Sequence, residues 1–134
     1  MNDAPGISER VLRFIADRID TVPELEALLL LWQDPDKRWR VEEIAQRLYV
    51  NTDAAAGILR ALHMRQLAAA EGQPPAYRYS SAWDESGRLM AEVDETYRHN
   101  LVRIATFIHS GGSSAVREFA RAFDFTRDRR ERMK

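Results

Sequence analysis

The stretch that decides the fold runs from Val41 to Leu62 and reads VEEIAQRLYVNTDAAAGILRAL. Residues 41–48 place apolar side chains at positions i, i+3, i+4 and i+7, which is the spacing of one helix face. The next four residues interrupt that spacing, and Asn51 is a residue type that caps a new helix well. The spacing then resumes and predicts a second helix that ends near Arg65. We therefore expect two short helices joined by a tight turn.

Two further helices are predicted before this stretch. Apolar spacing indicates the first over about residues 8–18, and Asp20 or Thr21 can cap the second. The second helix is apolar at almost every position from Leu25 to Trp32, which is typical of a helix buried on several sides. Pro35 ends it, because proline cannot continue the hydrogen-bond ladder. We expect this helix to be the centre of the core.

A β-hairpin is predicted after the helix pair. Residues 67–71 and 76–80 flank a turn of glycine, glutamine and two prolines at 72–75. Tyr77 and Tyr79 alternate with polar neighbours, which gives the second arm the character of a strand.

A single long helix is predicted after the hairpin. Asp84 can cap it, and apolar residues follow one another at steps of three or four until the glycines at 111–112. A helix of about 25 residues is roughly 38 Å long, which exceeds what a domain of this size can cover. Part of its apolar stripe therefore needs another partner, and we expect a homodimer. The candidate dimerisation residues are Tyr97, Leu101, Ile104 and Ile108.

The order of these elements resembles the winged helix-turn-helix of bacterial transcription regulators, including those of the MarR type. The resemblance rests on residues 41–48, on residues 51–62 and on Arg65-Gln66-Leu67, which lead into the hairpin. It implies a mostly α fold with a two-stranded β-hairpin as the wing and a long C-terminal helix. The expected parts are a winged-helix domain at 1–82, a dimerisation helix at 83–110, and an amphipathic segment with a charged tail at 111–134.

The resemblance also implies a transcriptional regulator that binds duplex DNA. The absence of cysteine and of a long apolar run leads us to expect a cytoplasmic protein, and the few available cations lead us to expect DNA binding that is weak or requires a partner. In such regulators the second helix of the pair lies in the major groove, while the wing contacts phosphates or the minor groove. The candidate DNA-binding residues are Lys37, Arg38, Arg40, Thr52, Arg60 and Arg78.

The start of the second helix departs from the pattern of that family. Asp53 would face phosphates with the wrong sign, and alanine and glycine offer no side-chain hydrogen bonds to bases. The alternative function is a protein–protein interaction adaptor that keeps the winged-helix shape but has lost DNA readout. Its candidate contact residues are Ala54, Ala56, Gly57, Phe119 and Phe123.

The distribution of charge favours the adaptor. Residues 1–97 hold 11 Lys and Arg against 17 Asp and Glu, whereas residues 98–134 hold 9 against 4, and the whole chain has a net charge of -1. The predicted winged-helix body is therefore acidic, although DNA-binding surfaces are usually basic.

Composition and spacing indicate neither an enzyme nor a metal or cofactor site. The chain has no cysteine, and its three histidines, at 63, 99 and 109, lack the spacing of metal ligands. No phosphate-binding glycine loop or nucleophile elbow is present. The longest apolar run is too short to cross a bilayer, so we expect no membrane insertion.

Overall fold

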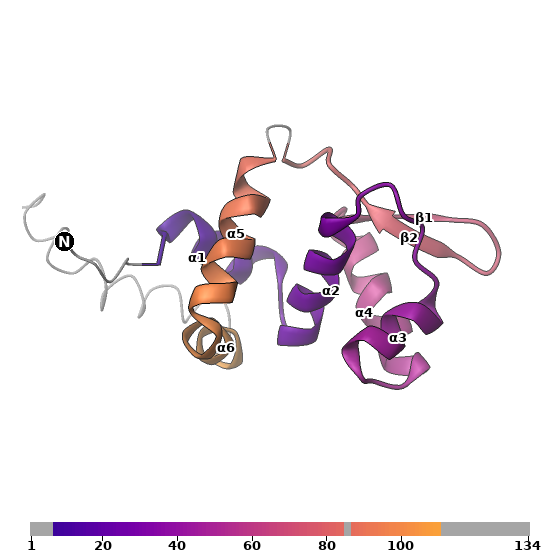
Figure 1. Ribbon diagram of the computed structural model, residues 1–134, viewed down its shortest axis with the longest axis horizontal. Helices are drawn as coiled ribbons and strands as arrows, with labels where there is room; N and C mark the ends of the chain where they lie inside the picture. Colours follow the sequence, from indigo (N-terminus) through magenta and orange to yellow (C-terminus); the bar gives the residue numbers. More distant parts are fainter. Residues whose placement is uncertain (1–6, 85–86, 111–134) are drawn as a thin grey trace, which may run out of the picture. The chain divides into compact units, whose positions relative to one another are not determined.

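The computed structural model describes residues 7–84 and 87–110, which are mostly helical and include one small antiparallel sheet. The chain divides into two units, residues 21–90 and the segments 1–20 with 91–134. Along the described chain the elements are α1 (Glu9–Arg18), α2 (Val22–Gln33), α3 (Val41–Leu48), α4 (Thr52–Met64), β1 (Ala68–Glu71), β2 (Ala76–Tyr79), α5 (Arg88–His99) and α6 (Leu101–His109) (Figure 1).

Helix α2 is the centre of the unit formed by residues 21–90, as its sequence predicts. Thr21 caps it, and the Thr21 Oγ1 accepts a hydrogen bond of 3.2 Å from the backbone N–H of Glu24. The helix packs against α3, α4 and β2. Leu25, Leu28 and Leu31 have no exposed surface, because their sides of the helix face these neighbours. Burial of several leucines stabilises the unit by about 2 kcal/mol for each side chain.

The predicted tight turn between α3 and α4 is confirmed. Tyr49 ends α3 in the left-handed conformation, with φ of 58°. The backbone N–H of Val50 then donates to the carbonyl of Ala45 at 3.1 Å. Asn51 caps α4, because its Oδ1 accepts a hydrogen bond of 2.7 Å from the backbone N–H of Ala54.

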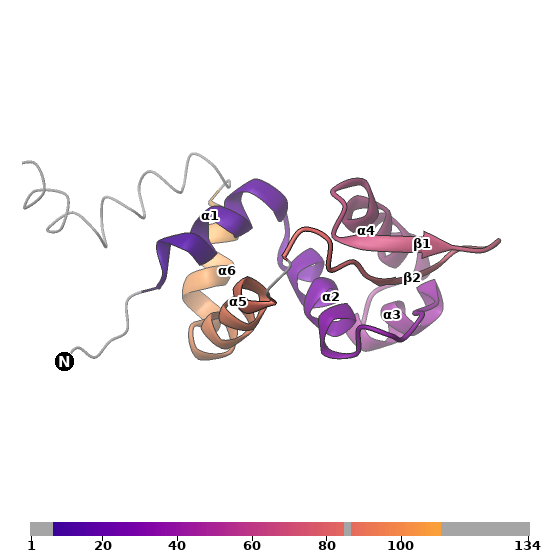
Figure 2. The same cartoon turned by 90° about the horizontal axis from the view of Figure 1, so that it is seen from above.

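The predicted hairpin is also confirmed. Strands β1 and β2 pair antiparallel, from Ala68 opposite Tyr79 to Glu71 opposite Ala76, and the hairpin lies beside α4 in Figure 2. Trp39 joins its edge: the Trp39 N–H donates to the carbonyl of Tyr77 at 2.6 Å, and the Tyr77 N–H donates back at 2.8 Å. This bridge fixes the segment before α3 against the hairpin.

The prediction of one long C-terminal helix is wrong, because the helix is broken at Asn100. Helix α5 ends at His99, and α6 begins at Leu101. Asn100 has φ of −142° and ψ of 44°, and its side-chain N–H donates to the carbonyl of Thr96 at 3.0 Å. A short amide side chain that bonds to the backbone in this way competes with the helical ladder. The two helices are therefore each much shorter than the predicted one.

This break removes the premise of the dimer prediction. Of the four candidate dimerisation residues, Tyr97, Ile104 and Ile108 are buried within the chain, and Leu101 remains 51% exposed. The expected exposed stripe is therefore absent from the described residues 87–110. The dimer itself stays a prediction.

Helix α1 lies beside α5 and α6 in both ribbon views (Figures 1 and 2). It buries Val11, Phe14 and Ile15 on one side, as the apolar spacing predicts. On the polar side, the guanidinium of Arg10 lies 3.5 Å from the carboxylate of Glu92.

Two further findings concern the remaining predictions. Phe119 and Phe123, with the rest of residues 111–134, lie outside the described residues. Across residues 7–84 and 87–110, no helix is long and apolar enough to span a membrane.

Candidate functional site

The exposed face of α4 carries the residues that sequence reasoning selected. Ala55, Leu59 and Leu62 are buried on the inner face of the helix. Thr52, Asp53, Ala54 and Arg60 are exposed, and Ala56 and Gly57 are half-buried. The guanidinium of Arg60 makes no ion pair or hydrogen bond with any described residue. The outer face of α4 therefore offers one available cation and several side chains without hydrogen-bonding groups.

Two of the candidate DNA-binding arginines share one carboxylate. The Nε of Arg38 lies 2.8 Å from one oxygen of Glu71, and the Nε of Arg78 lies 3.0 Å from the other. Arg78 pairs with Ala69 across the hairpin, so it lies diagonally opposite Glu71 on the same face. The Trp39–Tyr77 bridge brings the neighbouring Arg38 to this place.

The other two basic candidates before α3 are also paired with acids. The Nζ of Lys37 lies 3.2 Å from the carboxylate of Glu43, and the Nε of Arg40 lies 3.8 Å from that of Glu42. Glu43 also accepts a hydrogen bond of 2.8 Å from the backbone N–H of Arg40. This backbone hydrogen bond, and then the Lys37 ammonium, lower the pKa of Glu43 despite some desolvation.

These pairs change the electrostatics of the predicted DNA surface. Four of the five basic candidates have an acidic partner inside the unit, and only Arg60 has none among the described residues. Sequence reasoning identified the cations but missed the pairing. The signal for one pair was present, since counting back from the turn places Glu71 and Arg78 on one face of the hairpin.

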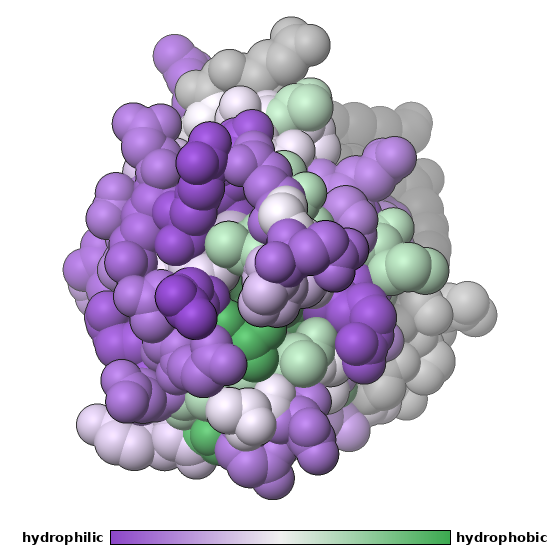
Figure 3. Space-filling model, turned by 90° about the vertical axis from the view of Figure 1, so that its right-hand side faces the viewer, coloured by the Kyte–Doolittle hydropathy of each residue, from purple (hydrophilic) through white to green (hydrophobic). Residues whose placement is uncertain are grey.

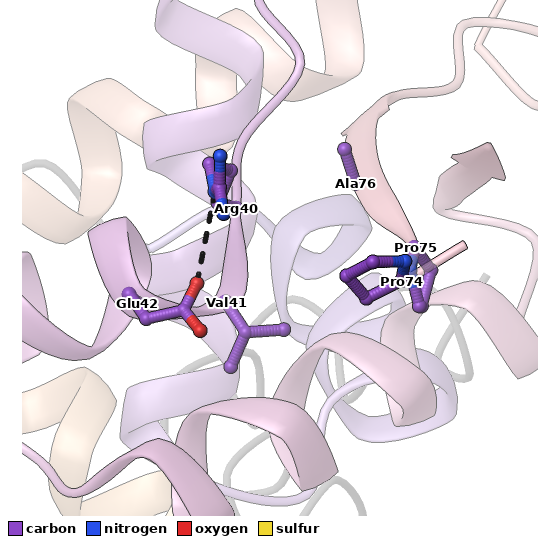
Figure 4. Close-up of a pocket in the computed structure, with 6 residues that line it drawn as sticks. All are labelled: Arg40, Val41, Glu42, Pro74, Pro75 and Ala76. Carbon is purple, nitrogen blue, oxygen red and sulfur yellow. Dashed lines mark ion pairs between the residues drawn. The ribbon is translucent and has the colours of Figure 1, made fainter. Parts of the chain in front are cut away.

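A small hollow lies between the start of α3 and the end of the hairpin (Figure 4). It has a volume of about 200 Å³ and is lined by Arg40, Val41, Glu42, Pro74, Pro75 and Ala76. Its walls are mainly apolar, and the Arg40–Glu42 ion pair lies at the rim in Figure 4. Seen from the hairpin side, the surface has hydrophobic atoms at its centre and hydrophilic residues around them (Figure 3).

Tyr49 is the most exposed large hydrophobic residue among the described residues, at 94%. It lies in the turn directly before α4, where its left-handed backbone holds the ring away from the core. Sequence reasoning did not select it, although it lies at the interruption between the two predicted helices.

Neither a metal site nor a tyrosine with a lowered pKa is found among the described residues. No three His, Asp or Glu side chains among residues 7–84 and 87–110 are placed to hold a metal ion. Burial, and then the charge of Asp84, raise the pKa of Tyr79 far above its ordinary value, so the phenol stays protonated.

Comparison with known protein families, with curated proteins and with solved structures gave no match.

Proposed function

We propose that residues 21–90 form a winged helix-turn-helix module of a regulatory protein, and that its helix pair and hairpin contact a protein partner. The order α2, α3, α4, β1 and β2 supports the winged-helix arrangement, with α4 in the position of the recognition helix. The observation that carries the choice of partner is that Arg38 and Arg78 are both paired with the carboxylate of Glu71.

Pairing weakens the case for a DNA-binding surface in a simple way. Affinity for duplex DNA comes largely from cations that release counterions from phosphates. A cation that already has an acidic partner must give up that partner, and the remaining carboxylate repels the phosphate. Glu71 thus opposes phosphate binding at both arginines of the hairpin region. Sequence readout is also poor, since Ala54, Ala56 and Gly57 cannot hydrogen-bond to base edges.

The helix pair and the hairpin also have features that suit a protein. Exposed aromatic residues such as Tyr49 are enriched among the residues that dominate protein–protein binding. The hollow beside Val41 can take an apolar side chain of a partner. Charged residues next to that side chain in the partner would then face Arg40 and Glu42 at the rim. The small residues on α4 allow a flat segment or a second helix to approach closely. The partner we propose is therefore a protein that inserts an apolar side chain between oppositely charged neighbours.

A second function, weak duplex binding by a transcriptional regulator, is favoured by one observation. Thr52 and Arg60 are both exposed on α4, and the Arg60 guanidinium has no partner among the described residues. Two such contacts predict binding that is non-specific and steeply dependent on salt.

The substitution Ala56→Arg separates the two functions, because they predict effects of opposite sign. On a protein-binding surface, a large cation at a half-buried contact position abolishes capture of the partner. On a DNA-facing helix, the same cation strengthens duplex binding. The matched control is Ala91→Arg, which adds the same charge at an exposed position of α5.

Both properties are measured on the full chain. Partner capture is compared between wild type and variants in nuclease-treated lysate, and duplex affinity is measured by fluorescence anisotropy. Circular dichroism confirms that each variant is folded. Capture that survives Ala56→Arg unchanged contradicts the protein-binding surface, and a gain in duplex affinity supports the second function.

A further inference from the structure

Two cationic side chains lie over the ring of Trp39. The Nζ of Lys37 is 4.8 Å from the centroid of the ring, and the guanidinium carbon of Arg47 is 5.6 Å from it. Trp39 is only 5% exposed, and its backbone is fixed by the two hydrogen bonds with Tyr77. Attraction to the indole therefore holds each of these two cations beside the same buried ring.

These side chains line a hollow at the end of α2. It has a volume of about 440 Å³, and its lining residues are Leu30, Gln33, Asp34, Lys37, Trp39 and Arg47. That volume falls within the range of roughly 300–1,000 Å³ that small-molecule sites occupy. All the lining residues belong to the unit formed by residues 21–90.

Most of the polar side chains around this hollow are exposed and have no hydrogen-bond partner among the described residues. The side chains of Arg47, Gln33 and Asp34 make no hydrogen bond or ion pair with described residues. Lys37 donates to Glu43 through one of its three N–H bonds, so two remain. The indole Nε1 of Trp39 is also buried and has no hydrogen-bond partner among the described residues. A buried N–H group without an acceptor destabilises the folded state.

The charges around the hollow are opposite in sign but do not meet. Among the described residues, no ion pair joins Asp34 to Arg47 or to Lys37. A simple anion in the hollow would be repelled by Asp34, and a simple cation would be repelled by the two basic residues. A ligand that carries both charges would satisfy both sides.

We propose that this hollow binds a small zwitterion of the α-amino acid type. Its carboxylate lies against Arg47 and Lys37, and its ammonium group lies against Asp34. Leu30 contributes an apolar wall, so the ligand side chain is aliphatic. The proposal does not depend on the function proposed above, because no residue of the α4 surface takes part in it.

The test compares two probes, L-norvaline and pentanoate, which differ only in the α-ammonium group. Binding to the full chain is followed by the NMR signal of the Trp39 indole N–H, which is assigned by its loss in Trp39→Phe. We expect L-norvaline to bind roughly tenfold more tightly than pentanoate, since a hydrogen bond to a charged group is worth about that factor. Asp34→Asn removes this difference, and Arg47→Gln weakens the binding of both probes.

The matched control is Arg60→Gln, which removes a cation of the same unit that lies outside the hollow. It leaves the affinity for both probes unchanged. The proposal is overturned if neither probe moves the Trp39 signal in a saturable way, or if pentanoate binds as tightly as L-norvaline. It is also overturned if Arg60→Gln weakens binding as much as Arg47→Gln does.

Discussion

Arg38 and Arg78 bind opposite oxygens of a single carboxylate, that of Glu71, at 2.8 and 3.0 Å. The two arginines come from different segments, one before α3 and one in β2. The hairpin register and the Trp39–Tyr77 bridge bring them together. If the unit is the winged-helix module proposed above, the protein supplies its own anion at the place where its wing would otherwise contact a phosphate.

The first prediction is that Glu71→Gln strengthens duplex binding, because it removes the anion held between the two arginines. At low salt we expect affinity to rise roughly three- to tenfold, and the dependence on salt concentration to become steeper by about one to two phosphate contacts. Fluorescence anisotropy with a labelled duplex, repeated over a series of salt concentrations, measures both effects.

The control for this prediction is Glu95→Gln, which removes the same charge from an exposed position of α5. An equal rise in affinity with Glu95→Gln would mean that only net charge matters. In that case Glu71 has no specific role.

The second prediction separates the buried from the exposed side of α6. Ile104 has no exposed surface, whereas Leu101 is 51% exposed. We expect Ile104→Asp to lower the free energy of unfolding by about 3 kcal/mol, since it buries an unpaired charge. Leu101→Asp should cost less than about 1 kcal/mol. Urea unfolding measures both.

Light scattering on the same two proteins tests the dimer. If the wild type is a dimer that forms through this part of α6, Leu101→Asp halves its mass while the chain stays folded. A wild type with the mass of one chain removes the dimer prediction.

Apolar spacing predicted the α3–α4 helix pair but missed the break between α5 and α6 at Asn100, and both outcomes follow from what the spacing measures. Spacing reports which side chains face the core, and at the α3–α4 turn the interruption is long enough to disturb it. At Asn100 the break is one residue, so the apolar steps of three and four continue across it. The signal that could have found it is the asparagine itself, since its side chain competes for backbone hydrogen bonds.

The candidate site was predictable in its residues but not in its contacts. The outward positions of α4 follow from helical spacing alone, and the structure exposes most of them while leaving Ala56 and Gly57 half-buried. The pairing of Arg38 with Glu71 depends on how two distant segments pack, which no local pattern records. The hollow beside Trp39 could not be predicted either. Nothing in the sequence indicates that Asp34 and Arg47, two polar residues in different segments, line one hollow.

The third prediction concerns the left-handed residue at the end of α3. Tyr49 has φ of 58°, a conformation that costs a residue with a side chain about 1–2 kcal/mol. Its ring is 94% exposed, so little packing is lost on removal. Relief of this strain stabilises the fold, whereas the greater freedom of glycine in the unfolded chain destabilises it. We therefore expect Tyr49→Gly to raise the free energy of unfolding by up to about 1 kcal/mol.

The control is Gln46→Gly, at an exposed position inside the same helix, which should lower stability by about 1 kcal/mol. A loss of stability with Tyr49→Gly would show that the ring makes contacts worth more than the strain. If Tyr49→Gly stabilises the fold and also abolishes partner capture, the ring is retained for binding.

The last prediction concerns how stability depends on pH through Glu43. The backbone N–H of Arg40, and then Lys37, lower the pKa of Glu43 from 4.5. A carboxyl group whose pKa is lower in the folded state stabilises the fold above its unfolded pKa, and this contribution is lost as pH falls through the folded pKa.

Two substitutions separate the causes of this stabilisation. Glu43→Gln keeps an oxygen that accepts from Arg40 but loses the charge that attracts Lys37, so at pH 7 it should cost about 0.5 kcal/mol. Glu43→Ala loses both interactions and should cost about 1 kcal/mol. In acid, at a pH below the lowered pKa of Glu43, the wild-type carboxyl group is protonated, so its advantage over Glu43→Gln should shrink, whereas the deficit of Glu43→Ala should persist. Urea unfolding at both pH values measures these differences, with Glu42→Gln as the control. An advantage over Glu43→Gln of the same size at both pH values would contradict the role assigned to the charge of Glu43.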